Sequence, residues 1–200
     1  MNSTVIENEM DTPTTLQYVI TSEPMQDKAV KKLPRKAKDL IEQLHDEVQY
    51  FPEDAVPKLL KLIKKYPDVP IFYNYLSVAY KSLGRKEEYE KTLLMLYETH
   101  PDYLFGRLGF AEYLLQKGEY SKIPEVFDNK YDLKQLYPNR NQFHVTEAAA
   151  FMGIMALYWI AIGDRDIAKR YSDMLKQVAP KHQVTRQVAK KLNPIRSLLW

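Results

Sequence analysis

The sequence predicts an all-α protein, a solenoid of three to four αα-hairpins closed by a C-terminal capping helix. Apolar residues recur at spacings of three and four along most of the chain, as they do on one face of an α-helix. Gly84 and Gly118 are 34 positions apart, and the same distance separates Pro67 from Pro101. Because one helical hairpin cannot bury its apolar face alone, such a period indicates that neighbouring hairpins stack.

The clearest hairpin is expected across residues 70–103. Its first helix carries Leu76 and its second helix carries Leu93, each within a set of apolar residues at helical spacing. Gly84 can adopt the left-handed conformation that ends a helix, and Pro101 cannot continue one. Both boundaries of this hairpin therefore have a steric cause.

This unit resembles the tetratricopeptide repeat family, whose pattern is W-x2-L-G-x2-Y, then A-x3-F, then P. On residues 70–103 the pattern falls on Tyr73, Leu76, Ser77, Tyr80, Tyr89, Leu93 and Pro101. The resemblance implies a right-handed superhelix in which the first helix of each hairpin lines a concave groove.

Other hairpins are expected at about 36–69, 104–137 and 149–180. The 104–137 unit has Gly118 at its turn but Gln135 where the pattern has proline, whereas the last unit keeps both Gly163 and Pro180. Gly163 follows Gly118 by 45 positions, which is 11 more than the period. We therefore expect a loop insertion at about 138–148.

The two ends of the predicted helical domain, residues 34–200, differ from its repeats. Residues 1–33 lack a helical period and are predicted to form a tail that is mostly disordered or extended. Its one extended run, residues 16–20, either stays mobile or lies along the helical scaffold of this chain or a neighbour, because concave repeat surfaces accept extended peptides. Residues 181–200 are predicted to form the capping helix or, alternatively, an apolar tail that binds a partner.

The composition indicates more about the cellular compartment of the protein than about its class of partner. The chain has 29 Lys and Arg against 26 Asp and Glu, so its net charge of +3 favours no class of partner. It has no cysteine, and residues 1–12 lack the basic start and apolar run of a secretory signal, so we expect a cytoplasmic protein. The uncharged stretch 148–163 is shorter than the roughly 20 residues that span a bilayer, and it is predicted to be a buried helix.

No enzyme is predicted, and no catalytic residue, metal or cofactor. The four histidines lie far apart in the sequence, and no two of them have a spacing typical of metal ligands. Glu42 with His45 and His144 with Glu147 are single pairs, whereas a metal site within a helical bundle needs several converging ligands. Neither a glycine-rich phosphate loop nor a nucleophile elbow is present in the sequence.

The predicted function is that of a protein–protein interaction scaffold or adaptor. The resemblance places one set of side chains in the concave groove: Asn74, Val78, Lys81, Leu108, Glu112, Leu115, Gly153, Leu157 and Ile160. This set is mostly apolar, which favours a helix or an extended apolar peptide as ligand. Only Asn74 and Lys81 suit the carboxylate clamp of chaperone-binding members, so that clamp is not expected. Each of these residues could instead pack within the fold or against the chain's own tails.

Two alternative functions use other parts of the chain. Residues 28–38 contain six Lys or Arg and no acid, and residues 181–196 are similarly basic, so these segments could contact nucleic acid or an acidic surface. Neither segment has the interleaved aromatic residues of single-strand binding proteins. The second alternative is self-association into a homo-oligomer through the end repeats or the C-terminal tail.

Overall fold

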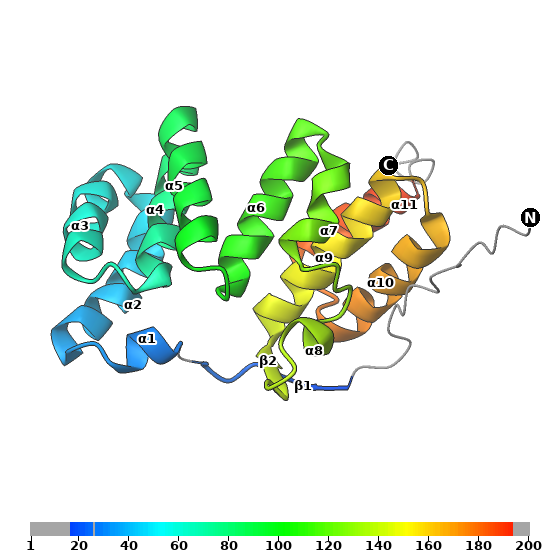
Figure 1. Cartoon of the computed structure of the whole chain (residues 1–200), viewed down its shortest axis with the longest axis horizontal. Helices are drawn as coiled ribbons and strands as arrows, with labels where there is room; N and C mark the ends of the chain where they lie inside the picture. Colours follow the sequence, from blue (N-terminus) through cyan, green and yellow to red (C-terminus); the bar gives the residue numbers. More distant parts are fainter. Residues whose placement is uncertain (1–16, 26, 194–200) are drawn as a thin grey trace, which may run out of the picture. The chain divides into compact units, whose positions relative to one another are not determined.

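The computed structural model describes residues 17–25 and 27–193. The all-α prediction is confirmed, because these residues form eleven α-helices, one 3-10 helix and a single two-stranded sheet (Figure 1). The chain divides into two compact units. One, here called the continuous unit, is Glu23–Gly118, and the other, the split unit, combines Met1–Ser22 with Glu119–Trp200. The division therefore falls at residues 22 and 118, whereas the sequence predicted a single helical domain after residue 33.

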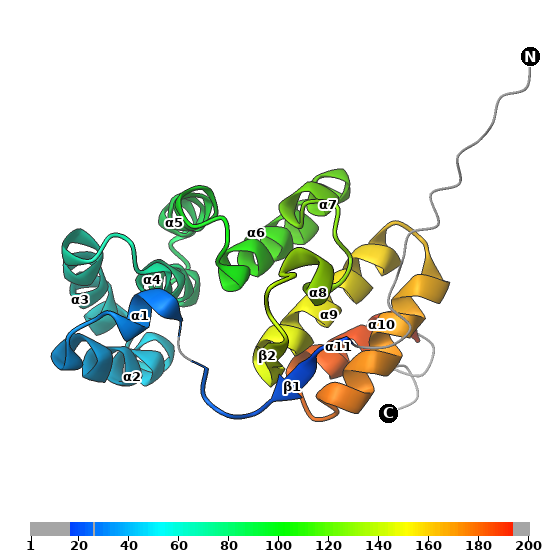
Figure 2. The same ribbon diagram turned by 60° about the horizontal axis from the view of Figure 1, so that its bottom comes forward.

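The continuous unit consists of six helices in sequence: α1 (Lys28–Lys31), α2 (Arg35–Tyr50), α3 (Pro52–Lys65), α4 (Pro70–Ser82), α5 (Lys86–Thr99) and α6 (Leu104–Lys117). Helix α4 packs against α2, α3 and α5, and α6 packs mainly against α5 (Figure 2). Short turns join the helices. For example, a single residue, Phe51, separates α2 from α3. The fully buried Leu44, Leu59 and Phe72 bring α2, α3 and α4 into one core.

The turn between α4 and α5 has the geometry that a glycine permits. Gly84 has φ of +68°, its N–H donates to the Lys81 carbonyl at 3.2 Å, and the N–H of Arg85 donates to the Tyr80 carbonyl at 3.0 Å. This is the Schellman pattern, which satisfies carbonyls at the end of a helix. No atom outside the turn lies within 4 Å of a Cβ added at Gly84, so a side chain there would cause backbone strain without a clash.

We expect Gly84→Ala to lower the free energy of unfolding by about 1–2 kcal/mol, the cost of the left-handed conformation for an ordinary residue. Gly84→Asn should cost less, because asparagine adopts this conformation more readily. Urea denaturation followed by circular dichroism would measure both. An alanine variant as stable as the wild type would show that the left-handed turn is not required.

The second helix expected within residues 104–137 does not form. Between Gly118 and Tyr137 the split unit has only a 3-10 turn at Tyr120–Lys122 and the one-turn helices α7 (Ile123–Val126) and α8 (Leu133–Leu136). Asp128 and Asn129 both have positive φ, at 52° and 56°, and two consecutive left-handed residues cannot continue a right-handed helix.

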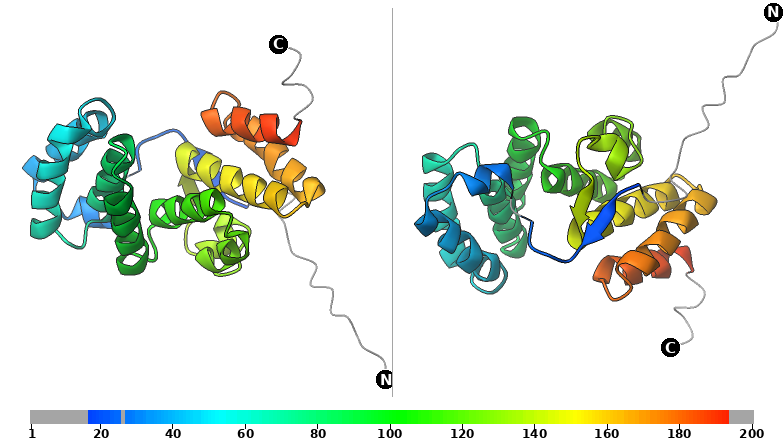
Figure 3. Two further views of the ribbon diagram at one scale, coloured as in Figure 1. Left: turned by 90° about the horizontal axis from the view of Figure 1, so that it is seen from above. Right: turned by 90° about the horizontal axis from the view of Figure 1, so that it is seen from below.

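The rest of the split unit is built around one helix. Its elements are β1 (Val19–Thr21), β2 (Gln142–His144), α9 (Val145–Ala161), α10 (Arg165–Val178) and α11 (Gln183–Leu192). Helices α10 and α11 both pack against α9, which also contacts the two strands (Figure 3). Buried side chains lie all around α9, Phe151, Met152 and Trp159 among them. No helix within residues 17–25 and 27–193 has both the length and the hydropathy of a membrane span.

Strands β1 and β2 pair in parallel, with Ile20 opposite Phe143. The ring of Tyr18 meets the ring of Phe143 edge to face at 4.9 Å, and the Val19 N–H donates to the Asn141 carbonyl at 2.9 Å. Of the two alternatives for residues 16–20, the described part, residues 17–20, therefore lies along the scaffold of the same chain. Strand β2 and the start of α9 occupy the region where the sequence predicted a loop insertion.

The predicted capping segment begins with a helix, α11, that fits closely against α9. A Cβ added at Gly153 in α9 would lie 2.2 Å from Cγ2 of Val184 in α11. The two helices can approach this closely only because residue 153 has no side chain. The apolar residues that could form a binding tail, from Ile195 onward, lie outside the described residues.

Candidate functional site

Two of the predicted groove residues, one from α4 and one from α6, are in contact. Asn74, Val78 and Lys81 follow one another by four and three positions on α4, and such spacing places side chains on one side of a helix. Leu108, Glu112 and Leu115 repeat the spacing on α6. The Lys81 Nζ and Glu112 Oε1 atoms are 2.9 Å apart, which joins the two sets. We call this surface the α4–α6 face.

These residues differ in their exposure. Leu108 is only 5% exposed and is therefore a packing residue, not a contact surface. Asn74, Val78 and Leu115 are half-buried. Lys81 and Glu112 are the most accessible, each with 46% of its side chain exposed. The α4–α6 face therefore combines an exposed ion pair with partly accessible apolar and amide groups.

Lys81 already has two partners within the chain. Besides Glu112, its Nζ lies 5.8 Å from the ring centroid of Tyr89 in α5. Burial, and secondarily the charge of Glu112, raises the pKa of Tyr89 to about 12, so this ring stays neutral at physiological pH. An exposed ion pair contributes only about 0.2–1 kcal/mol. A carboxylate on a ligand could therefore displace Glu112 from Lys81 at little cost.

The α4–α6 face borders a contact with α2 that the sequence did not predict. Tyr75 Oη lies 3.4 Å from Nδ1 of His45, a residue of α2. Burial, with a smaller contribution from Asp46, raises the pKa of Tyr75 to about 12. Tyr75 precedes Val78 by three positions, and this spacing could have marked it as a neighbour on the same side of α4.

The predicted groove residues of α9 belong to the other unit. Leu157 and Ile160 lie in the split unit, both half-buried, and so the α4–α6 face is built without them. Gly153, one turn before Leu157, is buried under Val184 of α11. At this position an apolar face of α9 is therefore filled by the chain's own C-terminal helix, one of the alternatives left open by the sequence.

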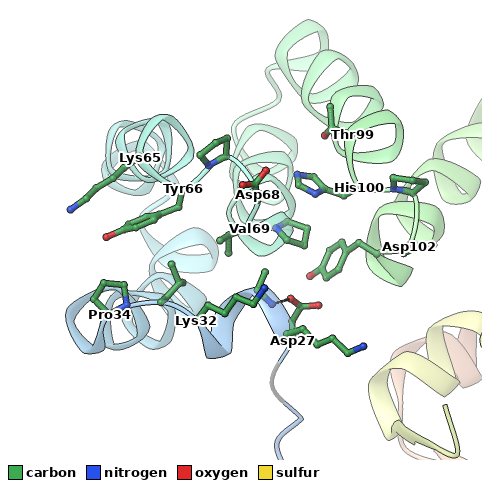
Figure 4. A pocket seen from close by; sticks show the side chains of 17 residues that line it. Asp27, Lys32, Pro34, Lys65, Tyr66, Asp68, Val69, Thr99, His100 and Asp102 are labelled. Carbon is green, nitrogen blue, oxygen red and sulfur yellow. Dashed lines mark hydrogen bonds between the residues drawn. The ribbon is translucent and has the colours of Figure 1, made fainter. Parts of the chain in front are cut away.

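A second feature of the continuous unit is a cavity of about 660 Å³ at the ends of its helices. It is lined by three segments, 27–34, 65–70 and 99–103, and we call it the turn cavity (Figure 4). Two of these segments contain equivalent turns, Tyr66-Pro67-Asp68 and His100-Pro101-Asp102, which are one repeat period apart. The third contains α1. Figure 4 shows Lys32 and Asp27 on one side of the cavity and Asp68 and His100 on the opposite side.

His100 has an unusual hydrogen-bonding state. It bonds to the Pro67 carbonyl, while its Nε2 atom is buried without a hydrogen-bond partner in the described structure. The bond to Pro67 is therefore made by Nδ1–H. Burial lowers the pKa of His100, which favours the neutral ring. In the neutral tautomer with a proton on Nδ1, Nε2 is a hydrogen-bond acceptor.

No arrangement of side chains suited to a metal stands out. Within residues 17–25 and 27–193, no group of three or more His, Asp or Glu side chains lies close enough together to hold a metal ion. Comparisons of the chain with protein-family models, with characterised proteins and with solved structures give no match. The resemblance to tetratricopeptide repeats therefore rests on the chain's own residues and their spacing.

Proposed function

We propose that this protein is a tetratricopeptide-like interaction module that binds a segment of a partner protein on the α4–α6 face. The main support is the ion pair between Lys81 and Glu112. The resemblance to tetratricopeptide repeats assigns these residues to the groove-lining helices of successive hairpins, and their contact is compatible with stacked hairpins. The absence of cysteine supports a cytoplasmic setting for such a module.

The chemistry of the face favours a mostly apolar partner segment. Val78 and Leu115 offer partly accessible aliphatic surface, which suits an amphipathic helix or an extended apolar peptide. The amide of Asn74 can donate to and accept from a peptide backbone. Lys81 adds a cation that a carboxylate of the partner could share with Glu112.

Paired charge substitutions test this function. Val78→Glu with Leu115→Glu places two carboxylates on the α4–α6 face, and because neither residue is fully buried, we expect the fold to persist. The control is Leu94→Glu with Met95→Glu on α5, where both side chains are more than 40% exposed. Each protein is used for affinity capture from the native host and quantified by mass spectrometry.

We expect the face variant to capture its specific partner at a level lower by about tenfold or more. In the complex, the two new carboxylates would be buried against the partner without a counter-charge. The control should retain that partner. Circular dichroism verifies that both variants are folded. Capture of the same proteins at the same levels by the face variant and the wild type would reject the proposal.

A further inference from the structure

Six exposed cations surround the turn cavity or adjoin its lining in sequence. They come from α1 and the turn after it, from the start of α2 and from the end of α3: Lys28, Lys32, Arg35, Lys36, Lys64 and Lys65. We call this group the basic rim. Among the described residues, none of the six forms an ion pair, although cations elsewhere, such as Arg85 and Lys117, lie against carboxylates. The rim thus presents cations without ion-pair partners among the described residues, beside the exposed carboxylates of Asp27, Asp68 and Asp102 that line the same cavity.

Helix stability explains only part of this placement. Lys64 and Lys65 lie in the last turn of α3, where the helix dipole favours cations. Arg35 and Lys36, by contrast, begin α2, whose first turn has no acidic residue and whose cap, Pro34, makes no side-chain hydrogen bond. The positive end of a helix dipole repels cations. The charges at the start of α2 therefore oppose the helix that carries them.

The interior of the turn cavity has a different chemistry from its rim. Its lining includes hydrogen-bond acceptors, namely the exposed Asp68 carboxylate and the buried Nε2 of His100. Asp27 also lines it, although its Oδ1 already accepts from the Ala29 N–H at 2.7 Å. Aromatic surface is supplied by the half-buried Tyr66 and Tyr103, one from each of the two equivalent turns.

We propose that the basic rim and the turn cavity bind single-stranded nucleic acid, with phosphates on the rim and one base inserted in the cavity. A nucleotide separates its anionic phosphate from a neutral, flat base, as the rim is separated from the acceptor-lined interior. Adenine and cytosine carry exocyclic amino groups that can donate to Asp68 and His100. Every base can also stack on a tyrosine ring.

Two other anionic partners fit less well. The side chains of an acidic peptide would bring carboxylates toward Asp27 and Asp68, which repel them. A bilayer surface could contact the rim but could not fill a cavity of about 660 Å³. This site shares no lining residue with the α4–α6 face and does not depend on the proposed function.

Fluorescence anisotropy with labelled oligoadenylate and oligouridylate of about 12 nucleotides tests the proposal, because single-strand binding sites span about 4–16 nucleotides. The rim variant is Lys32→Glu with Arg35→Glu and Lys36→Glu. Its matched control, Arg186→Glu with Lys190→Glu and Lys191→Glu, makes the same change in net charge on exposed residues of α11. Binding is measured at about 50 mM and about 200 mM salt, a range over which phosphate contacts weaken strongly.

We expect the rim variant to bind about tenfold more weakly or worse. The slope of the logarithm of the binding constant against the logarithm of salt concentration should fall in magnitude by about 2, because each of the three lost phosphate contacts contributes roughly 0.7. The control should stay close to the wild type. Equal losses in both variants, no binding at low salt, or equal binding of polyglutamate would overturn the proposal. So would a preference for vesicles that contain phosphatidylserine over the oligonucleotides.

A cavity variant separates base recognition from general attraction to a polyanion. Asp68→Ala removes a negative charge, so electrostatics alone would strengthen the binding of both oligonucleotides. Base insertion predicts instead that this variant loses the wild-type preference for oligoadenylate over oligouridylate. An unchanged preference, or its absence in the wild type, would contradict base insertion. This ratio can be measured even if the rim variant fails to fold.

Discussion

Gly153→Ala should lower the free energy of unfolding of the split unit by about 1–3 kcal/mol, the usual cost of overpacking a core. The new Cβ would lie 2.2 Å from Cγ2 of Val184, a separation that forces α9 and α11 apart. Alanine is the better helix former, so helix propensity alone predicts the opposite sign. Urea denaturation followed by circular dichroism decides between the two.

A double-mutant cycle assigns this effect to the contact between the helices. Val184→Ala removes the clashing methyl group, so Gly153→Ala should cost much less in the Val184→Ala background. Gly109→Ala in α6 is the control, because its Cβ would meet only the end of the Leu93 side chain at 2.9 Å. If the effects of the Gly153 and Val184 substitutions simply add, the close approach of α9 and α11 is wrong.

Trp159→Ala should cost about 3–5 kcal/mol of unfolding free energy, as expected for the truncation of a large buried aromatic residue. Trp159 is 2% exposed, and its ring lies 5.0 Å from that of Tyr158 and 5.5 Å from that of Tyr131. The substitution would leave a large cavity beside α9. The measurement requires circular dichroism, because the substitution also removes one of the two tryptophans of the chain.

Trp159→Phe should be much milder, at about 1.5 kcal/mol or less. The indole N–H of Trp159 is buried and has no acceptor in the described part of the chain. Leaving a buried donor unsatisfied costs about 1–3 kcal/mol, and phenylalanine removes this penalty while it fills most of the space. A phenylalanine variant as unstable as the alanine variant would show that the indole N–H has a partner or that its volume is indispensable.

The helices were the most predictable part of the fold, because their signals are local. Apolar periodicity predicted a helix around Leu76, the uncharged stretch 148–163 predicted the buried helix that contains Trp159, and Gly84 ends α4 for the steric reason inferred from the sequence. The missing second helix of the 104–137 unit was not predictable in this way. Asp128 and Asn129 are compatible with a helix end, but no pattern indicated that both would take the left-handed conformation.

The pairing of β1 with β2 was beyond local patterns. Each strand has three residues, and the paired Ile20 and Phe143 are more than a hundred positions apart in the chain. Three residues are too few to establish an alternation that distinguishes a strand. Only the apolar and aromatic composition of residues 16–20 hinted at an extended segment.

At the candidate sites too, some features were predictable from the sequence and others depend on how distant parts of the chain pack. The resemblance to tetratricopeptide repeats grouped Asn74 with Val78, but the burial of Leu108 and the cover over Gly153 depend on tertiary packing. The turn cavity was missed, although its signal was present. Tyr66-Pro67-Asp68 and His100-Pro101-Asp102 are similar turns one repeat period apart, and stacked hairpins bring equivalent turns to the same edge.

Site-specific photo-crosslinking tests the proposed function most directly, because it reports contact at a chosen residue in the native host. A photoreactive amino acid replaces Val78 on the α4–α6 face or, as the control, the exposed Leu94 on α5. The interaction module predicts a discrete crosslinked protein from position 78 and none from position 94. A crosslink from position 94 alone, or from both positions equally, would contradict partner binding on the α4–α6 face.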